Sequence, residues 1–73
     1  MARMPKLSGA DVIKILERKG YAQVRTRGSH VRLYPPEYLV NAKKVTVPLH
    51  KQLKQGTLMN IMRCAGLSAE DLQ

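Results

Sequence analysis

The sequence predicts a small α+β domain in which a helix, three antiparallel strands and a second helix follow one another along the chain. Three observations support this fold class: an amphipathic stretch with helix caps near the start, two alternating runs that flank a Gly-Ser turn, and a second amphipathic stretch near the end. The connections are short, which favours a meander with both helices on one face of the sheet. The 73 residues suit one domain with a thin core. We expect residues 1–6 to be a basic, disordered lead-in and residues 7–73 to form the domain.

The first helix is expected from about Gly9 to Lys19. Ser8 at the N-cap and Asp11 three residues later form a capping box, in which each side chain accepts a hydrogen bond from the other residue's backbone. Gly20 suits the position after the helix, where a left-handed residue commonly ends it. The apolar stripe that should face the core consists of Val12, Ile15 and Leu16, with Ile13 beside them.

A β-hairpin is expected around Gly28-Ser29. The flanking residues 21–27 and 30–34 alternate in polarity, and glycine in the first turn position suits a type II′ turn, which requires a positive φ there. In this register one face of the hairpin is apolar and can lie on a core. That face pairs Val24 with Leu33 and Thr26 with Val31.

The other face of the hairpin is basic, because Arg25 lies opposite Arg32 and Arg27 lies opposite His30. Like charges directly opposite each other destabilise a sheet. The simplest interpretation is a solvated basic face with splayed arginines. We favour an anion-binding face, because four basic or titratable side chains converge beside one turn.

The third strand is expected over residues 44–48, after Pro35-Pro36 ends the second, and the second helix starts near Gly56-Thr57 with Thr57 at its N-cap. Gly66 then ends that helix, and a second capping box opens a short helical turn at residues 68–71. The expected core consists of Val24, Val31, Leu33, Val45 and Val47 from the sheet, and of Val12, Ile15, Leu16, Leu58, Ile61 and Met62 from the helices. The open face of the sheet should carry Arg25, Arg27, His30, Arg32, Lys44 and Thr46.

The net charge is +8, with 13 basic residues against 5 acidic ones. This imbalance points to a polyanionic partner, nucleic acid first, although an acidic protein would explain it too. The single cysteine, Cys64, cannot form an internal disulfide, which fits a reducing cytosol. No apolar run approaches membrane-spanning length, so we expect no membrane contact. Two histidines and one cysteine, widely separated, do not make a zinc site, and no carboxylates cluster as in a two-metal nuclease, so we expect no metal and no cofactor.

Four short segments of the chain form a pattern that no one of them would give alone. They are Leu7-Ser8-Gly9 with the helix that ends at Lys19-Gly20-Tyr21, Arg27-Gly28-Ser29-His30, Val45-Thr46-Val47-Pro48 with His50, and Gly56-Thr57-Leu58 leading to Ala65-Gly66-Leu67-Ser68. In this order and spacing they resemble the HicA family of toxins, the small RNA-cleaving partners of HicB antitoxins. The resemblance implies an α-β-β-β-α fold similar to a double-stranded-RNA-binding domain. It also implies a cytoplasmic ribonuclease that acts on mRNA and is held inactive by a HicB-type antitoxin.

The catalytic histidine of this family lies in the Gly-Ser-His segment, so the resemblance implies that His30 is catalytic. Imidazole suits removal of the 2′-hydroxyl proton of RNA, and the nearby arginines suit stabilisation of a phosphorane-like transition state. Many members carry a second histidine directly afterwards, where this chain has Val31. His50, or Lys51, is a possible general acid if the loop after the third strand folds toward His30. A loop histidine without a catalytic task is the simpler interpretation of His50.

The other positions expected to touch RNA supply phosphate contacts, which give affinity and salt dependence rather than sequence preference. Tyr34 and Tyr38 could stack on the bases of single-stranded RNA, but Tyr34 could equally cap the sheet edge. The expected RNA-binding residues are Arg25, Arg27, Ser29, Arg32, Lys44, Lys51 and Lys54.

Two other functions compete with the ribonuclease. A non-catalytic RNA-binding module of the same fold would bind RNA and return it intact. An interaction protein with a basic face for an acidic partner would show no RNA affinity even at low salt.

Overall fold

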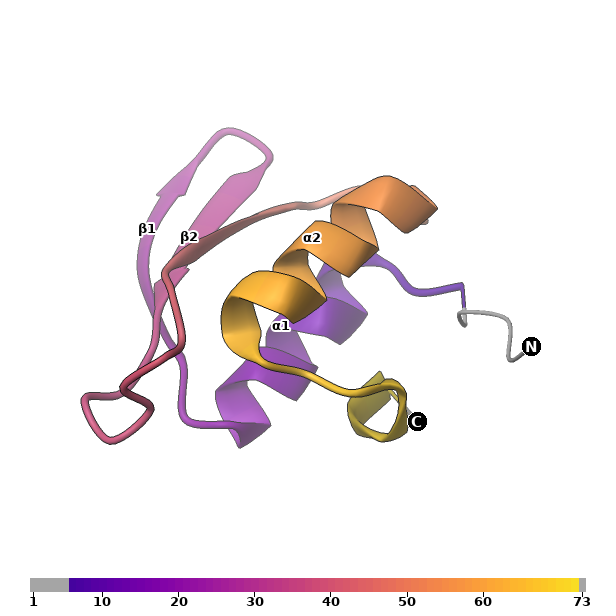
Figure 1. The fold of residues 1–73 in the computed structure, drawn as a ribbon. Helices are drawn as coiled ribbons and strands as arrows, with labels where there is room; N and C mark the ends of the chain where they lie inside the picture. The colour runs from indigo at the N-terminus through magenta and orange to yellow at the C-terminus, as the bar shows by residue number, and fades with distance from the viewer. Residues whose placement is uncertain (1–5, 73) are drawn as a thin grey trace.

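The computed structural model describes residues 6–72, which fold into a layer of two helices packed on a three-stranded antiparallel sheet (Figure 1). The α+β fold and the order of its elements are therefore as predicted. Most of the predicted lead-in over residues 1–6 lies outside the described residues. The elements are α1 (Gly9–Arg18), β1 (Ala22–Arg27), β2 (His30–Tyr34), β3 (Val45–Pro48), α2 (Gln55–Ala65) and the 3₁₀ helix η1 (Ala69–Leu72).

Helix α1 begins at the predicted capping box. The Asp11 backbone N–H donates to the Ser8 hydroxyl at 3.0 Å, and the Ser8 backbone N–H donates to the Asp11 carboxylate at 3.1 Å. Hydrogen bonding of the Asp11 carboxylate by the Ser8 backbone N–H, and then by the Ser8 side chain, lowers the pKa of Asp11 below its ordinary value. The helix ends at Arg18 with Lys19 as its C-cap, and Gly20 follows it as predicted, with a φ of 103° that favours glycine. The buried Tyr21 follows, and its hydroxyl donates to the Lys43 carbonyl at 2.7 Å, which joins the exit of α1 to the segment before β3.

The strands pair in the order β1-β2-β3. Gly28 has a φ of 58°, whereas Ser29 has no positive φ, which is the pattern of the predicted type II′ turn. The predicted register holds for the three pairs nearest the turn. These are Arg27 with His30, Thr26 with Val31, and Arg25 with Arg32.

A β-bulge at Val24 changes the rest of the hairpin. The register shifts between Gln23 and Arg25, so Gln23 rather than Val24 lies opposite Leu33. The Gln23 side-chain amide donates to Glu17 of α1 at 3.3 Å, which places Gln23 on the helix side of the sheet. The prediction that Val24 joins the core is wrong, since this side chain is 53% exposed. The physical reason is that a bulge opposes two residues to one and breaks the strict alternation of side chains.

The core lies between the helices and the strands β2 and β3. Both α1 and α2 pack against β3, and the residues of β1 are all exposed, so the hairpin extends past the helix layer (Figure 1). Except for Val24, the predicted core residues are buried, with Met62 half-buried against them. Further buried residues complete the core. They are Ile13, Tyr21, Leu53, Ala65, Leu67 and Leu72.

Helix α2 begins earlier than predicted. Lys54 occupies the N-cap position without a side-chain cap, and Thr57 lies inside the first turn, so the predicted Thr57 cap is wrong. The cause is tertiary: the buried Leu53 donates its backbone N–H to the Leu7 carbonyl at 2.8 Å, which fixes the chain just before the helix. Gly66 ends α2 with a φ of 67°, as predicted.

The short turn after α2 is η1, which is held against the end of α1. The Asp71 carboxylate accepts the Ser68 backbone N–H at 2.8 Å and lies 2.7 Å from the Lys19 ammonium. The contact with Lys19, followed by the Ser68 hydrogen bond, lowers the pKa of Asp71. Cys64 is half-buried on α2, where it packs against the edge of the core. Neither helix within residues 6–72 has the length and apolar character needed to cross a membrane.

Candidate nucleic-acid interface

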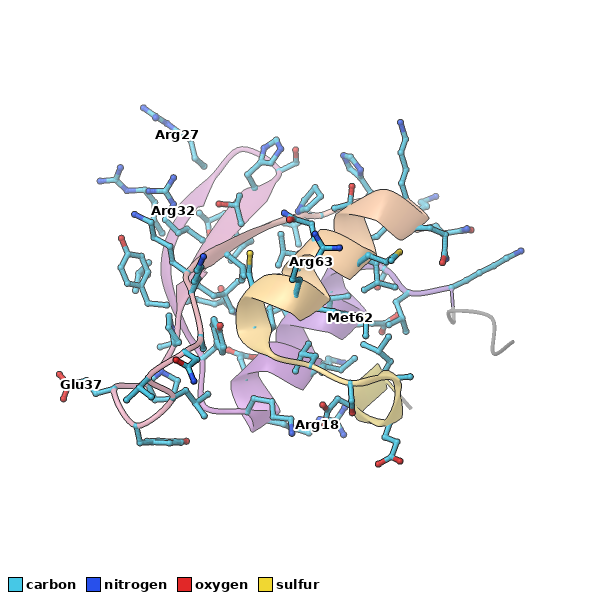
Figure 2. All side chains as sticks on the ribbon, in the orientation of Figure 1. Arg18, Arg27, Arg32, Glu37, Met62 and Arg63 are labelled. Atoms are coloured by element: carbon cyan, nitrogen blue, oxygen red, sulfur yellow. The ribbon has the colours of Figure 1, made fainter. Side chains whose placement is uncertain are left out.

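The sheet face turned away from the helices, here called the open face, carries the basic side chains. Alternation along β2 buries Val31 and Leu33 on the helix side and leaves His30, Arg32 and Tyr34 exposed on the other. Figure 2 shows Arg27 and Arg32 projecting from the hairpin on the side away from α2. The open face is thus the alternate set of side chains on the same strands that build the core.

A groove of about 310 Å³, here called the basic groove, lies on the open face near the hairpin turn. All three strands contribute to it, because His30 pairs with Arg27 on β1 and Arg32 pairs with Arg25 on β1 and with Thr46 on β3. The structure therefore brings His30 together with three arginines, as the register of the hairpin suggests. The lining residues are Arg25, Arg27, His30, Arg32 and Thr46.

The positive charge of the basic groove is not neutralised within the described part of the chain. The ion pair found among residues 6–72 joins Lys19 to Asp71, on the helix side. Arg25 and Arg32 face each other across the β1–β2 pair, an arrangement that costs stability unless an anion lies between them. The groove therefore offers an imidazole and three guanidinium groups to an anionic ligand.

The loop after β3 starts beside the hairpin turn. The Leu49 backbone N–H donates to the Ser29 carbonyl at 2.6 Å, and the next residue, His50, accepts the Gly9 backbone N–H at 2.9 Å. The loop backbone thus lies close to the turn that carries His30. The side chains of His50 and Lys51 are exposed and do not line the basic groove, and Lys54 follows at the start of α2.

The sequence model of the family described as HicA toxin of bacterial toxin-antitoxin matches residues 9–67. The chain belongs to the HicA toxin family. The matched range includes the whole sheet and all residues of the basic groove. No curated protein sequence matches the chain. Membership in a toxin–antitoxin family implies an antitoxin partner for this HicA chain.

The position after the groove histidine belongs to the core in this HicA chain. Val31 is 3% exposed and faces the helices, as the alternation along β2 predicts. A side chain there is directed away from the basic groove. The groove lining in this chain therefore contains one imidazole, that of His30.

A second hollow of about 350 Å³, here called the tyrosine hollow, adjoins the basic groove on the open face of this HicA chain. It is lined by Val24, Arg25, Arg32 and Tyr34, so the two hollows share both arginines. The Lys44 ammonium lies 5.8 Å from the centroid of the Tyr34 ring. Sequence reasoning placed Arg25 and Arg32 here but missed Val24, because nothing in the alternating pattern marks the bulge.

Two further possibilities raised by the sequence, a stacking role for Tyr38 and a metal site, do not belong to this face. Tyr38 is 73% exposed and lines a different hollow, between residues 38–42 and the end of α2. Among residues 6–72, no three histidine, cysteine or acidic side chains gather at a position that could hold a metal ion.

Proposed function

We propose that this HicA-family chain is a metal-independent endoribonuclease that cleaves mRNA on its open face, with His30 as the general base. The observation that carries the proposal is the basic groove, in which one exposed imidazole stands among three arginines without a neighbouring carboxylate. Family membership supports the toxin role, and the net charge of +8 supports a polyanionic substrate.

The reaction follows from these groups. His30 takes the proton of a 2′-hydroxyl, the 2′-oxygen attacks the adjacent phosphorus, and the bond from phosphorus to the 5′-oxygen breaks. Arg27, with Arg25 and Arg32 beside it, stabilises the extra negative charge of the phosphorane-like transition state. The 5′-oxygen receives a proton from water, which reaches the open groove. We assign no step to His50, because it does not line the groove.

The lysines and the turn serine extend the proposed RNA surface beyond the groove. Lys44 lies beside Tyr34 on the open face, Ser29 is in the hairpin turn, and Lys51 and Lys54 follow in the loop after β3. Contacts from such residues to phosphates raise affinity and steepen its salt dependence without reading sequence.

The proposed protein partner is a HicB-type antitoxin that covers the open face. The unneutralised charge supports this, because the arginines of the basic groove have no acidic neighbour within the described chain and suit an acidic partner surface. An mRNA-cleaving toxin would work in the cytoplasm, where its substrate is. If a bound antitoxin left His30 accessible to solvent, simple coverage of the groove would be wrong.

The test is incubation of a labelled mixed-sequence RNA with the wild-type chain and with His30→Ala, in EDTA. We expect cleavage by the wild type and a loss of about 10²- to 10⁴-fold in the variant, the usual contribution of a positioned base. His50→Ala is the matched control, an exposed histidine off the groove, and should cleave like the wild type. Circular dichroism and RNA binding should be unchanged in both variants.

The other outcomes would indicate a different function or a different role for His50. RNA that is bound but stays intact with the wild type would indicate a binding module. Absence of RNA affinity even at low salt would indicate a surface for an acidic protein. Loss of cleavage in His50→Ala would make His50 the general acid.

A further inference from the structure

We propose that the tyrosine hollow is a base-binding subsite, in which a base of single-stranded RNA stacks on Tyr34 at some distance from the cleaved bond. This inference rests on the proposed ribonuclease function and names the form of RNA that the open face accepts. It starts from the continuity of the two hollows, which share Arg25 and Arg32. A strand with its cleaved phosphate at His30 would pass over these arginines toward Tyr34.

The Tyr34 ring is available for stacking. It is 42% exposed on the open face, so it does not serve the core. Lys44 approaches the ring from the β3 side, whereas the hollow is lined from β1 and β2. The Lys44 side chain does not line the hollow, so it does not fill the space in which a base would stack on the ring.

The bulge in β1 provides the second wall of this subsite. It puts Val24 on the same face as Arg25, and both line the hollow. Val24 is 53% exposed, an apolar side chain within an otherwise charged surface. An apolar wall facing an aromatic ring, with two guanidinium groups between the hollow and the basic groove, matches a nucleotide: a flat base joined to a phosphate.

The spacing along β2 sets the distance between the stacked base and the cleaved bond. Tyr34 lies four residues from His30, roughly 13 Å along the strand at about 3.3 Å per residue. The base in the hollow therefore belongs to a nucleotide separated from the cleaved bond, and Arg25 and Arg32 face the backbone that joins them. Single-stranded RNA can turn its bases out in this way, whereas a duplex keeps them stacked and paired.

Tyr38 provides the matched control, since it is a more exposed tyrosine outside the subsite. It is 73% exposed, and the hollow that it lines contains no arginine. A general effect of removing a surface tyrosine would appear equally in Tyr34→Ala and Tyr38→Ala. A stacking subsite would appear only in the former, and Tyr34→Phe should retain it because the ring remains.

The first experiment measures cleavage of a defined single-stranded RNA that carries one cleavage site. We expect Tyr34→Ala to raise KM by roughly 5- to 150-fold, the range that stacking of one base on an aromatic ring provides, with kcat little changed. Tyr34→Phe and Tyr38→Ala should resemble the wild type. Removing the base at one position near the cleavage site of the RNA should raise the KM of the wild type by the same factor. It should have little further effect on the KM of Tyr34→Ala.

The second experiment does not depend on cleavage. The same RNA, with 2-aminopurine at that position, is bound to the His30→Ala chain, and stacking is expected to quench the fluorescence unless Tyr34 is also replaced by alanine. Quenching without cleavage by the wild type would retain the subsite and reject the ribonuclease. Cleavage with equal KM values for Tyr34→Ala and Tyr38→Ala, and no Tyr34-dependent quenching, would overturn the subsite alone.

Discussion

The two faces of the sheet use the same strands for opposite purposes. On the helix side, Val31 and Leu33 are 3% and 0% exposed and form the centre of the core. On the open face, the residues that alternate with them, His30 and Arg32, line a groove of unneutralised positive charge. Stability and the proposed chemistry therefore depend on different side chains of β2, and substitutions should separate them.

The two edge strands differ in a related way. Strand β3 is covered by both helices, whereas β1 extends past them and buries no residue. Folding therefore constrains β3 closely, but it leaves β1 free to carry a bulge and two arginines. Strand β1 therefore supplies only open-face residues to the basic groove, whereas β2 and β3 supply residues to both the groove and the core.

The largest expected effect separates neighbouring residues on β2. Leu33→Ala removes a fully buried side chain and should lower the free energy of unfolding by about 2–5 kcal/mol. Arg32→Ala, one residue away on the open face, should not lower it, because this side chain is exposed and lies opposite the like charge of Arg25. Urea unfolding followed by circular dichroism measures both. Similar losses would show that the open face contributes to folding as much as the core.

The next effect tests how closely β3 is attached. A Cβ atom on Gly9 would stand 2.0 Å from the Pro48 carbonyl oxygen, so Gly9→Ala forces α1 away from the end of β3. We expect a loss of about 1–3 kcal/mol in the free energy of unfolding. Gly56→Ala is the control, because the space around Gly56 in α2 is open, and it should be neutral or slightly stabilising. Equal effects of the two substitutions would contradict the close approach.

A smaller effect is expected at the arginine pair of the open face. Arg25→Gln removes the like charge opposite Arg32 and should raise the free energy of unfolding by roughly 0.2–1 kcal/mol. The same change should weaken RNA binding. It should also reduce the slope of log affinity against log salt concentration by about 1, which corresponds to the loss of one phosphate contact. Lys14→Gln, on the exposed side of α1, is the control and should alter neither quantity. Reduced stability in Arg25→Gln would mean that the arginines support the fold.

The smallest effect concerns a charge on the helix side that does support the fold. The pKa of Asp71 is lowered in the folded chain by Lys19 and Ser68, so its contribution to stability is present above the ordinary value of about 3.8 and is lost as the pH falls below it. Asp71→Asn should therefore reduce the loss of stability between pH 5 and pH 3, measured by urea unfolding. Glu37→Gln, an exposed loop substitution, should follow the wild type. Identical pH profiles for Asp71→Asn and the wild type would show that the Asp71 carboxylate does not contribute to the pH dependence of stability.

The sequence predicts those features that depend on local rules. The capping box of Ser8 and Asp11, the left-handed Gly28 and the pairing of Arg27 with His30 each follow from a few neighbouring residues. The features that it does not predict depend on distant contacts. The start of α2 is set by the burial of Leu53, and the bulge at Val24 interrupts a strand that buries no residue.

The proposed site divides in the same way. The basic groove follows from the hairpin register, so its histidine and arginines can be expected from sequence. The tyrosine hollow requires Val24 on the open face, which alternation places on the opposite side. The tyrosine hollow depends on the β-bulge at Val24, so it can be recognised only once the pairing of β1 with β2 is known.

The most direct test of the open face as a ribonuclease site is the chemical identity of the RNA ends that it produces in EDTA. Attack by the 2′-hydroxyl, with His30 as base, predicts a 2′,3′-cyclic phosphate on one fragment and a 5′-hydroxyl on the other. It also predicts that an RNA with a single 2′-deoxy nucleotide at the cleaved position is bound but stays intact. Fragments with a 5′-phosphate and a 3′-hydroxyl, or cleavage of the deoxy-substituted RNA at that position, would contradict a 2′-hydroxyl mechanism on this face.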